Sequence, residues 1–365
     1  MSNTVSLSFY ILSFLTSAYF FSYYKKEHTI VRWIGIIIAT VIPSLIAGLR
    51  YNVGTDWSNY YYILKVIKNT PVKELLTNSF WNVERGFLLL SKALVSLGGV
   101  PFAFGGIAFI TLLIVEVTLI RDYPEYNITL AYFIYLFTYF TQSFNIVRQI
   151  LALSFVFAGM KYVFESKPIK FLWMIAIATS FHRTSLIAIP IYLMWNREQS
   201  KALSTPKFLG VAAAASVIVV FWRAILRNLL GYGGIFIKYI GFLNDNVARN
   251  RDFYVKVIVF VVIYIIHKRM QDEDEKHKMF LQMGFINLLI GTTGFYITFF
   301  KRIGLYYEIP IILLLTSLEN AFTEKSKTIW NVTISVVVIF YFILVSFILG
   351  HNEVFPYQIY PKYAL

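Results

Sequence analysis

Long apolar stretches separated by short polar segments run through almost the entire chain. A helix needs about twenty apolar residues to cross the hydrocarbon of a bilayer. Stretches that fit this length are predicted as membrane-spanning helices at residues 5–24, 30–49, 102–121, 144–164, 252–267, 279–299, 303–319 and 328–349, with shorter ones at 127–142 and 207–222. The pattern predicts an all-α polytopic membrane protein, with residues 1–365 forming a single integral membrane domain.

Residues 171–195 fit either one long helix or two half-length helices that meet at Phe181-His182-Arg183. Basic residues favour the cytoplasmic side of a membrane, and they mark residues 25–29, 165–170 and 268–278 as cytoplasmic loops. An even number of crossings must separate the last two loops. Two helices in residues 171–195, together with spans 207–222 and 252–267, make four crossings, whereas one long helix would make three. We therefore expect a hairpin with His182 at its outer tip.

A similar count applies between the loop after span 30–49, which lies outside, and the inner loop at residues 165–170. An odd number of crossings must separate them, and spans 102–121, 127–142 and 144–164 already make three. Residues 86–97 therefore do not cross the membrane, and their short length fits a helix on the outer surface. The expected architecture therefore has about twelve spans, with both chain ends outside. Residues 50–101 would form an outer loop that carries amphipathic surface helices.

The composition supports the membrane class and narrows the chemistry. The chain is 58% hydrophobic and 14% charged, whereas soluble domains have about 25% charged residues. It has no cysteine, which excludes disulfides and thiolate metal sites, and its five histidines include no close pair, so no metal site is expected. The N-terminus lacks the basic region and cleavage site of a signal peptide. The net charge of +14 fits contacts with membrane lipids or an anionic substrate, and no basic, aromatic-interleaved segment indicates nucleic acid.

Three arginines, Arg50, Arg148 and Arg302, stand at predicted outer ends of apolar helices. Guanidinium groups bind phosphate through two hydrogen bonds and remain charged when partly desolvated. Each arginine alone fits a side chain that reaches lipid headgroups. All three together oppose the preference of basic residues for the inner side, so we expect them to bind one pyrophosphate.

Three residues are candidates for acid–base catalysis. Asp56 follows Gly54 and could deprotonate a hydroxyl or cap a helix that begins at Trp57. Glu84 could act likewise or pair with the dipole at a helix start. His182, at the hairpin tip, is either a base, an anion ligand or a structural residue.

Six ordered motifs resemble the EpsG family of exopolysaccharide and O-antigen polymerases, which are Wzy-like proteins. They are Arg50-Tyr-Asn-Val-Gly-Thr-Asp56, Glu84-Arg-Gly-Phe-Leu-Leu-Leu90, Asn145-Ile-Val-Arg-Gln-Ile-Leu-Ala152, Phe181-His-Arg-Thr-Ser-Leu186, Lys301-Arg-Ile303 and Phe355-Pro-Tyr357. The resemblance implies a glycosyltransferase similar to the GT-C class, in the bacterial inner membrane. Its active site would face the periplasm, where the first outer loop of this class carries an acidic residue and surface helices.

The expected reaction transfers a growing glycan from undecaprenyl pyrophosphate to a lipid-linked repeat unit, without a cofactor or metal. Residues beside the candidates are expected to bind substrate: Tyr51, Asn145, Gln149, Arg183 and Tyr357. A chain-length regulator and a flippase are further expected partners. An O-antigen ligase, which differs in its acceptor, and a flippase or other transporter of lipid-linked oligosaccharides are the alternatives.

Overall fold

The computed structural model describes residues 1–77, 83–196, 198–230, 251–270, 274–293 and 298–361. The helices are α1 (Asn3–Phe21), α2 (Thr29–Leu49), α3 (Trp57–Asn69), α4 (Val72–Thr77), α5 (Arg85–Asp122), α6 (Ile128–Tyr135), α7 (Val147–Phe164), α8 (Pro168–Phe181), α9 (Thr205–Leu230), α11 (Arg251–His267), α12 (Glu275–Thr293), α13 (Thr298–Glu308), α14 (Ile311–Ser317) and α15 (Glu324–Phe342). A 3₁₀ helix follows α8 at Arg183–Met194, and a short antiparallel pair joins β1 (Trp195–Asn196) to β2 (Lys201–Ala202).

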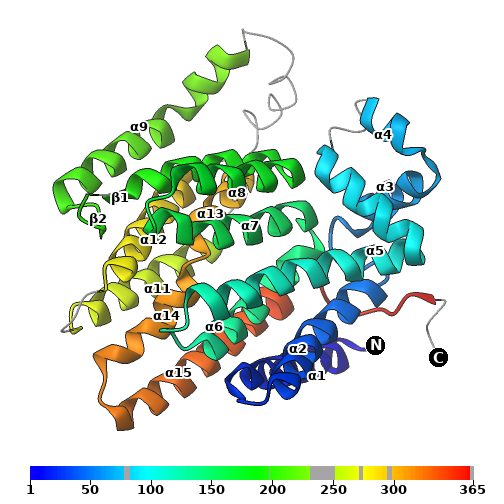
Figure 1. The fold of residues 1–365 in the computed structure, drawn as a ribbon, viewed down its shortest axis with the longest axis horizontal. Coiled ribbons are helices and arrows are strands. Elements are labelled where there is room, and N and C mark those ends of the chain that lie inside the picture. The colour runs from blue at the N-terminus through cyan, green and yellow to red at the C-terminus, as the bar shows by residue number, and fades with distance from the viewer. Residues whose placement is uncertain (78–82, 197, 231–250, 271–273, 294–297, 362–365) are drawn as a thin grey trace.

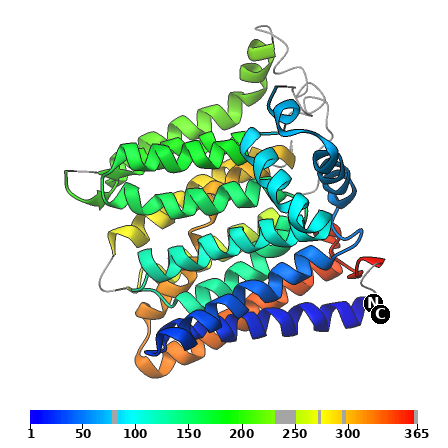
Figure 2. The same cartoon turned by 45° about the vertical axis from the view of Figure 1, so that its right-hand side comes forward.

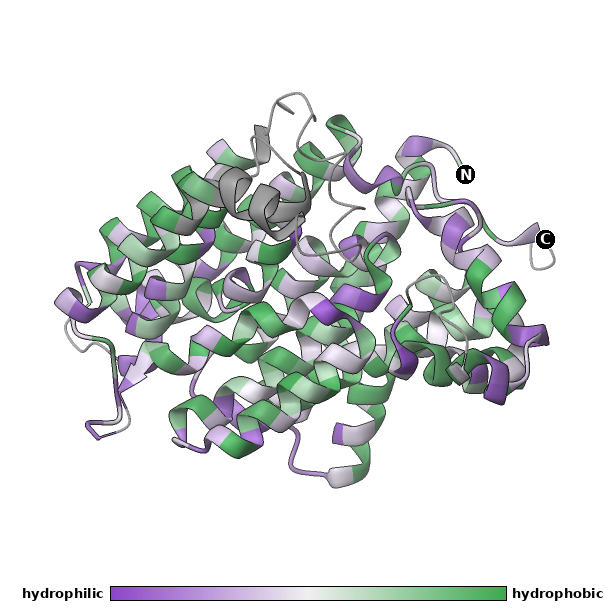
Figure 3. Cartoon of the chain, turned by 90° about the horizontal axis from the view of Figure 1, so that it is seen from above, coloured by the Kyte–Doolittle hydropathy of each residue, from purple (hydrophilic) through white to green (hydrophobic). Residues whose placement is uncertain are grey.

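The long helices lie side by side in one bundle (Figures 1 and 2). Within the described residues, five helices are long and apolar enough to cross a membrane. Large apolar side chains such as Leu12, Trp173 and Phe340 are more than 60% exposed on their helices, as expected for contact with lipid. Figure 3 shows apolar residues along the helices and hydrophilic residues gathered near their ends. The all-α membrane class is confirmed. The other predicted spans are shorter or interrupted, so the number of twelve stays a prediction.

Helix α5 is broken at Gly99, whose φ of 77° and ψ of −170° are not helical. Its 38 residues would measure about 57 Å if straight, far more than the hydrocarbon thickness of about 30 Å. Glycine adopts this positive φ without strain. Figure 2 shows the first part of α5, in cyan, turned across the end of the bundle, where α5 packs against α3. The predicted break between residues 86–97 and 102–121 is confirmed, and the surface location stays a prediction.

The chain reverses direction at His182, between α8 and the 3₁₀ helix. The ring of Phe171, near the start of α8, stacks on the ring of Tyr192 at a centroid distance of 5.6 Å. At the other end, the hydroxyls of Thr179 and Ser185 lie 2.9 Å apart. The two segments are therefore antiparallel, which confirms the predicted hairpin with His182 at its tip.

The C-terminal tail covers the loop that follows α2, shown in red beside the blue helices in Figure 2. The backbone N–H of Tyr360 donates to the carbonyl of Leu49 at 2.7 Å, and that of Tyr51 donates to the carbonyl of Gln358 at 2.8 Å. The loop and the tail are thus held together although they lie about 300 residues apart in the sequence.

Some predicted segments lie outside the described residues. They are residues 78–82 of the predicted outer loop, residues 271–273 of the predicted cytoplasmic loop, residues 294–297 of the predicted span 279–299, and the side chain of Lys301 next to Arg302.

Candidate functional site

A buried carboxylate, Glu84, lies at the centre of a cluster of basic side chains. Its Oε2 accepts a hydrogen bond from Nη1 of Arg148 at 2.5 Å. Its Oε1 accepts from the backbone N–H of Arg183 at 3.1 Å and from Nε of Arg183 at 3.4 Å. Nδ1 of His182 lies 3.6 Å from the same oxygen, which is within ion-pair distance but too long for a hydrogen bond. Glu84 thus joins the start of α7 to the tip of the hairpin.

Local sequence explains how Glu84 reaches the hairpin. Glu84 is the last extended residue before α5, and Gly86 lies in the first turn of that helix. A Cβ atom on Gly86 would lie 2.7 Å from the carbonyl oxygen of Ser180. Since backbone atoms cannot move aside easily, only glycine permits this close approach of α5 to α8.

The basic groups keep Glu84 ionised. Burial by itself opposes ionisation, but His182, Arg148 and the N–H of Arg183 outweigh it and lower the pKa of Glu84 from 4.5 to about 2. The side chain of Glu84 is 8% exposed, while those of Arg148 and Arg183 are 22% and 43% exposed. A carboxylate with such a low pKa is a weak base, so the geometry favours Glu84 as the residue that positions the guanidinium groups.

Helix α3 brings Asp56 close to this cluster. The Nε of Arg148 donates to the hydroxyl of Tyr60 at 3.4 Å, and Tyr60 follows Asp56 by one helical turn on the same face of α3. The backbone N–H of Asp56 lies 3.5 Å from Oδ1 of Asn145. Asp56 occupies the N-cap position of α3, but its side chain makes no capping hydrogen bond. Its half-buried carboxylate has no basic partner within ion-pair distance in the described part of the chain.

Helix α13 closes the other side of the cluster. The side-chain amide of Gln149 donates to the backbone carbonyl of Arg302 at 2.5 Å. One turn further, the hydroxyl of Tyr306 lies 3.1 Å from that of Thr184 in the hairpin. The side chain of Arg302 is exposed. The structure therefore brings Arg148, Arg302 and Arg183 to one end of the bundle, on three different segments.

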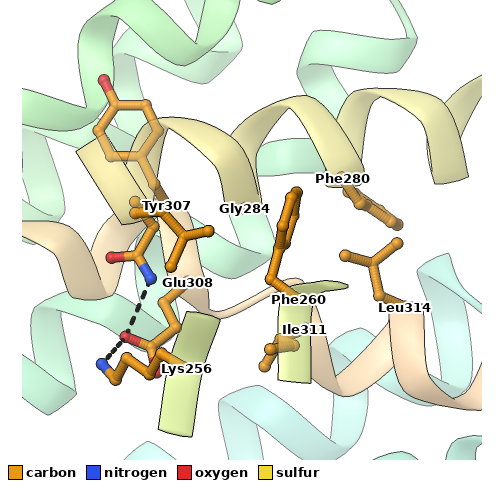
Figure 4. A pocket seen from close by; sticks show the side chains of 10 residues that line it. Lys256, Phe260, Phe280, Gly284, Tyr307, Glu308, Ile311 and Leu314 are labelled. Atoms are coloured by element: carbon orange, nitrogen blue, oxygen red, sulfur yellow. Dashed lines mark hydrogen bonds and ion pairs between the residues drawn. The ribbon is translucent and has the colours of Figure 1, made fainter. Parts of the chain in front are cut away.

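Further along α13, a second ionic contact holds the helix in place. Nζ of Lys256, on α11, lies 2.5 Å from Oε2 of Glu308, and the amide of Asn287, on α12, donates to the same oxygen at 3.4 Å (Figure 4). The cavity beside this contact has a volume of about 20 Å³. That volume holds about one water molecule and neither a lipid nor a sugar. The contact therefore supports the position of α13.

Arg50 does not join the other arginines. It is 2% exposed, and its Nη1 donates to the carbonyls of Phe144 and Val53 at 2.8 and 3.1 Å. The guanidinium carbon lies 4.3 Å from the ring centroid of Phe144 and 4.7 Å from that of Phe104. These contacts favour a structural role, and the expectation that Arg50 binds pyrophosphate gains no support from its position.

Tyr357 is likewise buried, at 1% exposure. Its hydroxyl donates to the carbonyl of Ile46 at 3.0 Å, and its N–H donates to the hydroxyl of Ser6 at 2.9 Å. These contacts favour packing over substrate binding. Tyr51, by contrast, is 36% exposed and lies beside Trp57, with a ring distance of 5.0 Å.

Sequence patterns did not indicate Tyr60, Thr184 or Tyr306, which line the cluster. Tyr60 could have been found from its spacing of four residues after Asp56, and Thr184 from its place beside the hairpin tip. Tyr306 depends on how α13 packs against the hairpin, for which the sequence has no signal. No group of three or more His, Asp or Glu side chains that could hold a metal ion occurs within the described ranges.

The fold and this cluster define a helical membrane protein with a basic site at one end of its bundle. The sequence matches the EpsG family over residues 33–359. The chain therefore belongs to the EpsG family, and membership indicates a polymerase-type glycosyltransferase role in exopolysaccharide synthesis. The comparison with curated proteins found no match, and neither did the comparison with solved structures.

Proposed function

We propose that the protein polymerises lipid-linked sugar repeats on the periplasmic side of the bacterial inner membrane. The donor is a growing glycan on undecaprenyl pyrophosphate, and the acceptor is one repeat unit on a second such lipid. The first outer loop, with Asp56, α3 and the first part of α5, fits the arrangement of the GT-C class. A flippase that supplies the repeat unit and a chain-length regulator are its proposed partners.

The observation that carries this proposal is that Arg148 and Arg183 both contact a single buried carboxylate, Glu84, while Arg302 lies on the neighbouring helix α13 at the same end of the bundle. Two guanidinium groups against one carboxylate leave an excess of positive charge, and the exposed side chain of Arg302 adds a further positive charge at this end of the bundle. Arg148 also lies in the first turn of α7, where unpaired backbone N–H groups and the helix dipole favour an anion. Such a site fits a pyrophosphate.

In the proposed reaction, a hydroxyl of the acceptor sugar attacks the anomeric carbon of the donor. The bond between that carbon and the pyrophosphate oxygen breaks, and the pyrophosphate leaves with the electron pair. The hydroxyl proton passes to a base. Since the leaving group carries the developing negative charge, Arg148, Arg183 and Arg302 stabilise the transition state by binding it. A cation cluster of this kind performs the task without a metal ion.

We assign the base to Asp56. Glu84 is occupied by two arginines and has a pKa of about 2, and His182 lies beside Glu84 within the same cluster. Asp56 carries no ion pair in the described part of the chain. The backbone N–H of Asp56 also lies 3.5 Å from the side chain of Asn145, which precedes Arg148 by three residues. An acceptor hydroxyl at Asp56 would therefore be near the leaving group at Arg148.

The test uses purified protein with lipid-linked repeat units extracted from cells that express it. We expect a ladder of longer glycans and one undecaprenyl pyrophosphate released for each bond formed, both in the presence of EDTA. Transfer only to a different acceptor, such as lipid A core, would indicate a ligase. Movement of the lipid across vesicles without bond formation would indicate a flippase.

A further inference from the structure

Four aromatic side chains gather beside Asp56, on two segments from opposite ends of the chain. The ring of Trp57 stacks on Tyr61 at 4.8 Å and meets the edge of Tyr51 at 5.0 Å. Tyr360, from the C-terminal tail, lies 5.6 Å from Tyr51. The hydroxyls of Tyr61 and Tyr360 are 3.1 Å apart. We call these four residues the aromatic shelf.

The shelf is partly open to the surroundings. Tyr51 is 36% exposed and Trp57 is 6% exposed, while Tyr61 and Tyr360 are half-buried. Tyr51 is therefore the most exposed ring of the four. Hydrogen bonds between the tail and the loop, from Tyr360 N–H to the Leu49 carbonyl and from Tyr51 N–H to the Gln358 carbonyl, fix the two sides of the shelf against each other.

The chemistry of this shelf matches a sugar ring. The face of an aromatic ring carries partial negative charge, and it attracts the C–H groups on the apolar face of a pyranose. The hydroxyls of Tyr61 and Tyr360, which lie 3.1 Å apart, can also bond with sugar hydroxyls. Aromatic residues at a membrane interface also anchor proteins to headgroups, but here the rings pack on one another and lie next to the proposed base.

We propose that the aromatic shelf is the subsite that binds the sugars of the acceptor repeat unit. Asp56 directly precedes Trp57 in the chain, so a sugar whose hydroxyl reaches Asp56 continues over the shelf. The donor pyrophosphate occupies the basic cluster on the other side of Asp56, toward Arg148. This inference rests on the proposed polymerase function, and it adds which substrate the loop and the tail bind.

The kinetic test compares Tyr51→Ala with wild type in the purified assay, with donor and acceptor concentrations varied separately. We expect the KM for the acceptor to rise about 3- to 10-fold, the range of one aromatic contact, while kcat and the KM for the donor stay unchanged. Tyr51→Phe keeps the ring and should keep the wild-type KM. Tyr19→Ala is the matched control, because Tyr19 is also an exposed tyrosine, at 60%. It lies near the C-terminal end of α1 and is not part of the aromatic shelf.

A binding test separates this inference from the proposed function. The probe is the oligosaccharide released from the extracted repeat units by mild acid, and its binding to purified protein is measured by saturation-transfer NMR. Binding that Tyr51→Ala weakens, in a protein that does not polymerise, would support the shelf and overturn the polymerase function. Polymerisation with an unchanged acceptor KM in Tyr51→Ala would overturn the shelf and leave the function standing. Neither binding nor polymerisation by wild type would overturn both.

Discussion

Replacement of Glu84 by glutamine tests whether this carboxylate holds the basic cluster together. Glutamine has the same shape and can still accept from the N–H of Arg183, but it carries no charge. The pKa of Glu84 falls from 4.5 to about 2, and each unit corresponds to about 1.4 kcal/mol. The ionised carboxylate therefore stabilises the fold by up to about 3 kcal/mol at neutral pH. We expect Glu84→Gln to lower the free energy of unfolding by about 2–3 kcal/mol.

The pH dependence has a defined sign. Because the pKa of Glu84 is lower in the folded protein, its ionised form stabilises the fold fully above about pH 4.5, and this contribution is lost as the pH falls toward 2. At pH 3.5 the difference between wild type and Glu84→Gln should be about 1.4 kcal/mol smaller than at pH 7.

The assay is equilibrium unfolding in mixed micelles by titration with sodium dodecyl sulfate. Glu165→Gln is the control, because Glu165 pairs with Lys167 at 2.8 Å in an exposed position, where ion pairs contribute about 0.2–1 kcal/mol. If Glu84→Gln unfolds at the same free energy as Glu165→Gln, Glu84 is not the centre of the cluster and the assignment of its role is wrong.

Further predictions concern the buried arginine, the orientation and the base. Arg50→Met should reduce the amount of folded protein in the membrane, seen by size-exclusion chromatography, because Arg50 is buried against two rings; a well-folded variant that makes no polymer would return Arg50 to the pyrophosphate site. Ser326→Cys, in this cysteine-free chain, should resist a thiol reagent that cannot cross the membrane, and labelling in intact cells would reverse the orientation. Asp56→Asn should lower kcat about 10²–10⁴-fold with little change in KM, whereas near-normal turnover would make Asp56 a structural residue at the start of α3.

The length and charge of the apolar stretches were sufficient to predict much of the backbone. The break between residues 86–97 and 102–121 follows because residues 86–97 are too short for a span and the number of crossings between loops forbids one there. The hairpin at His182 follows from the number of crossings between basic loops. These features depend on local length and on the side of the membrane. For that reason they could be derived without knowing which helices pack together.

The sequence was a poorer guide to the site, because arginines at helix ends look alike in a sequence. Arg50 and Arg148 both stand at the end of an apolar stretch, yet Arg50 lies between Phe104 and Phe144 while Arg148 pairs with Glu84. Which of these environments an arginine enters depends on contacts between distant segments. The role of Glu84 is hidden in the sequence for the same reason, since its partners lie about 64 and 99 residues away.

The rate of undecaprenyl pyrophosphate release by Arg148 variants tests the central claim most directly. We expect Arg148→Ala to lose at least about 10²-fold in rate, as when one donor to a developing negative charge is removed, and Arg148→Lys to recover part of it. Arg121→Ala, at an exposed arginine paired with Asp122, should keep the wild-type rate. Wild-type release and full-length polymer from Arg148→Ala, at a normal level of folded protein, would contradict the proposal that the basic cluster binds the leaving pyrophosphate.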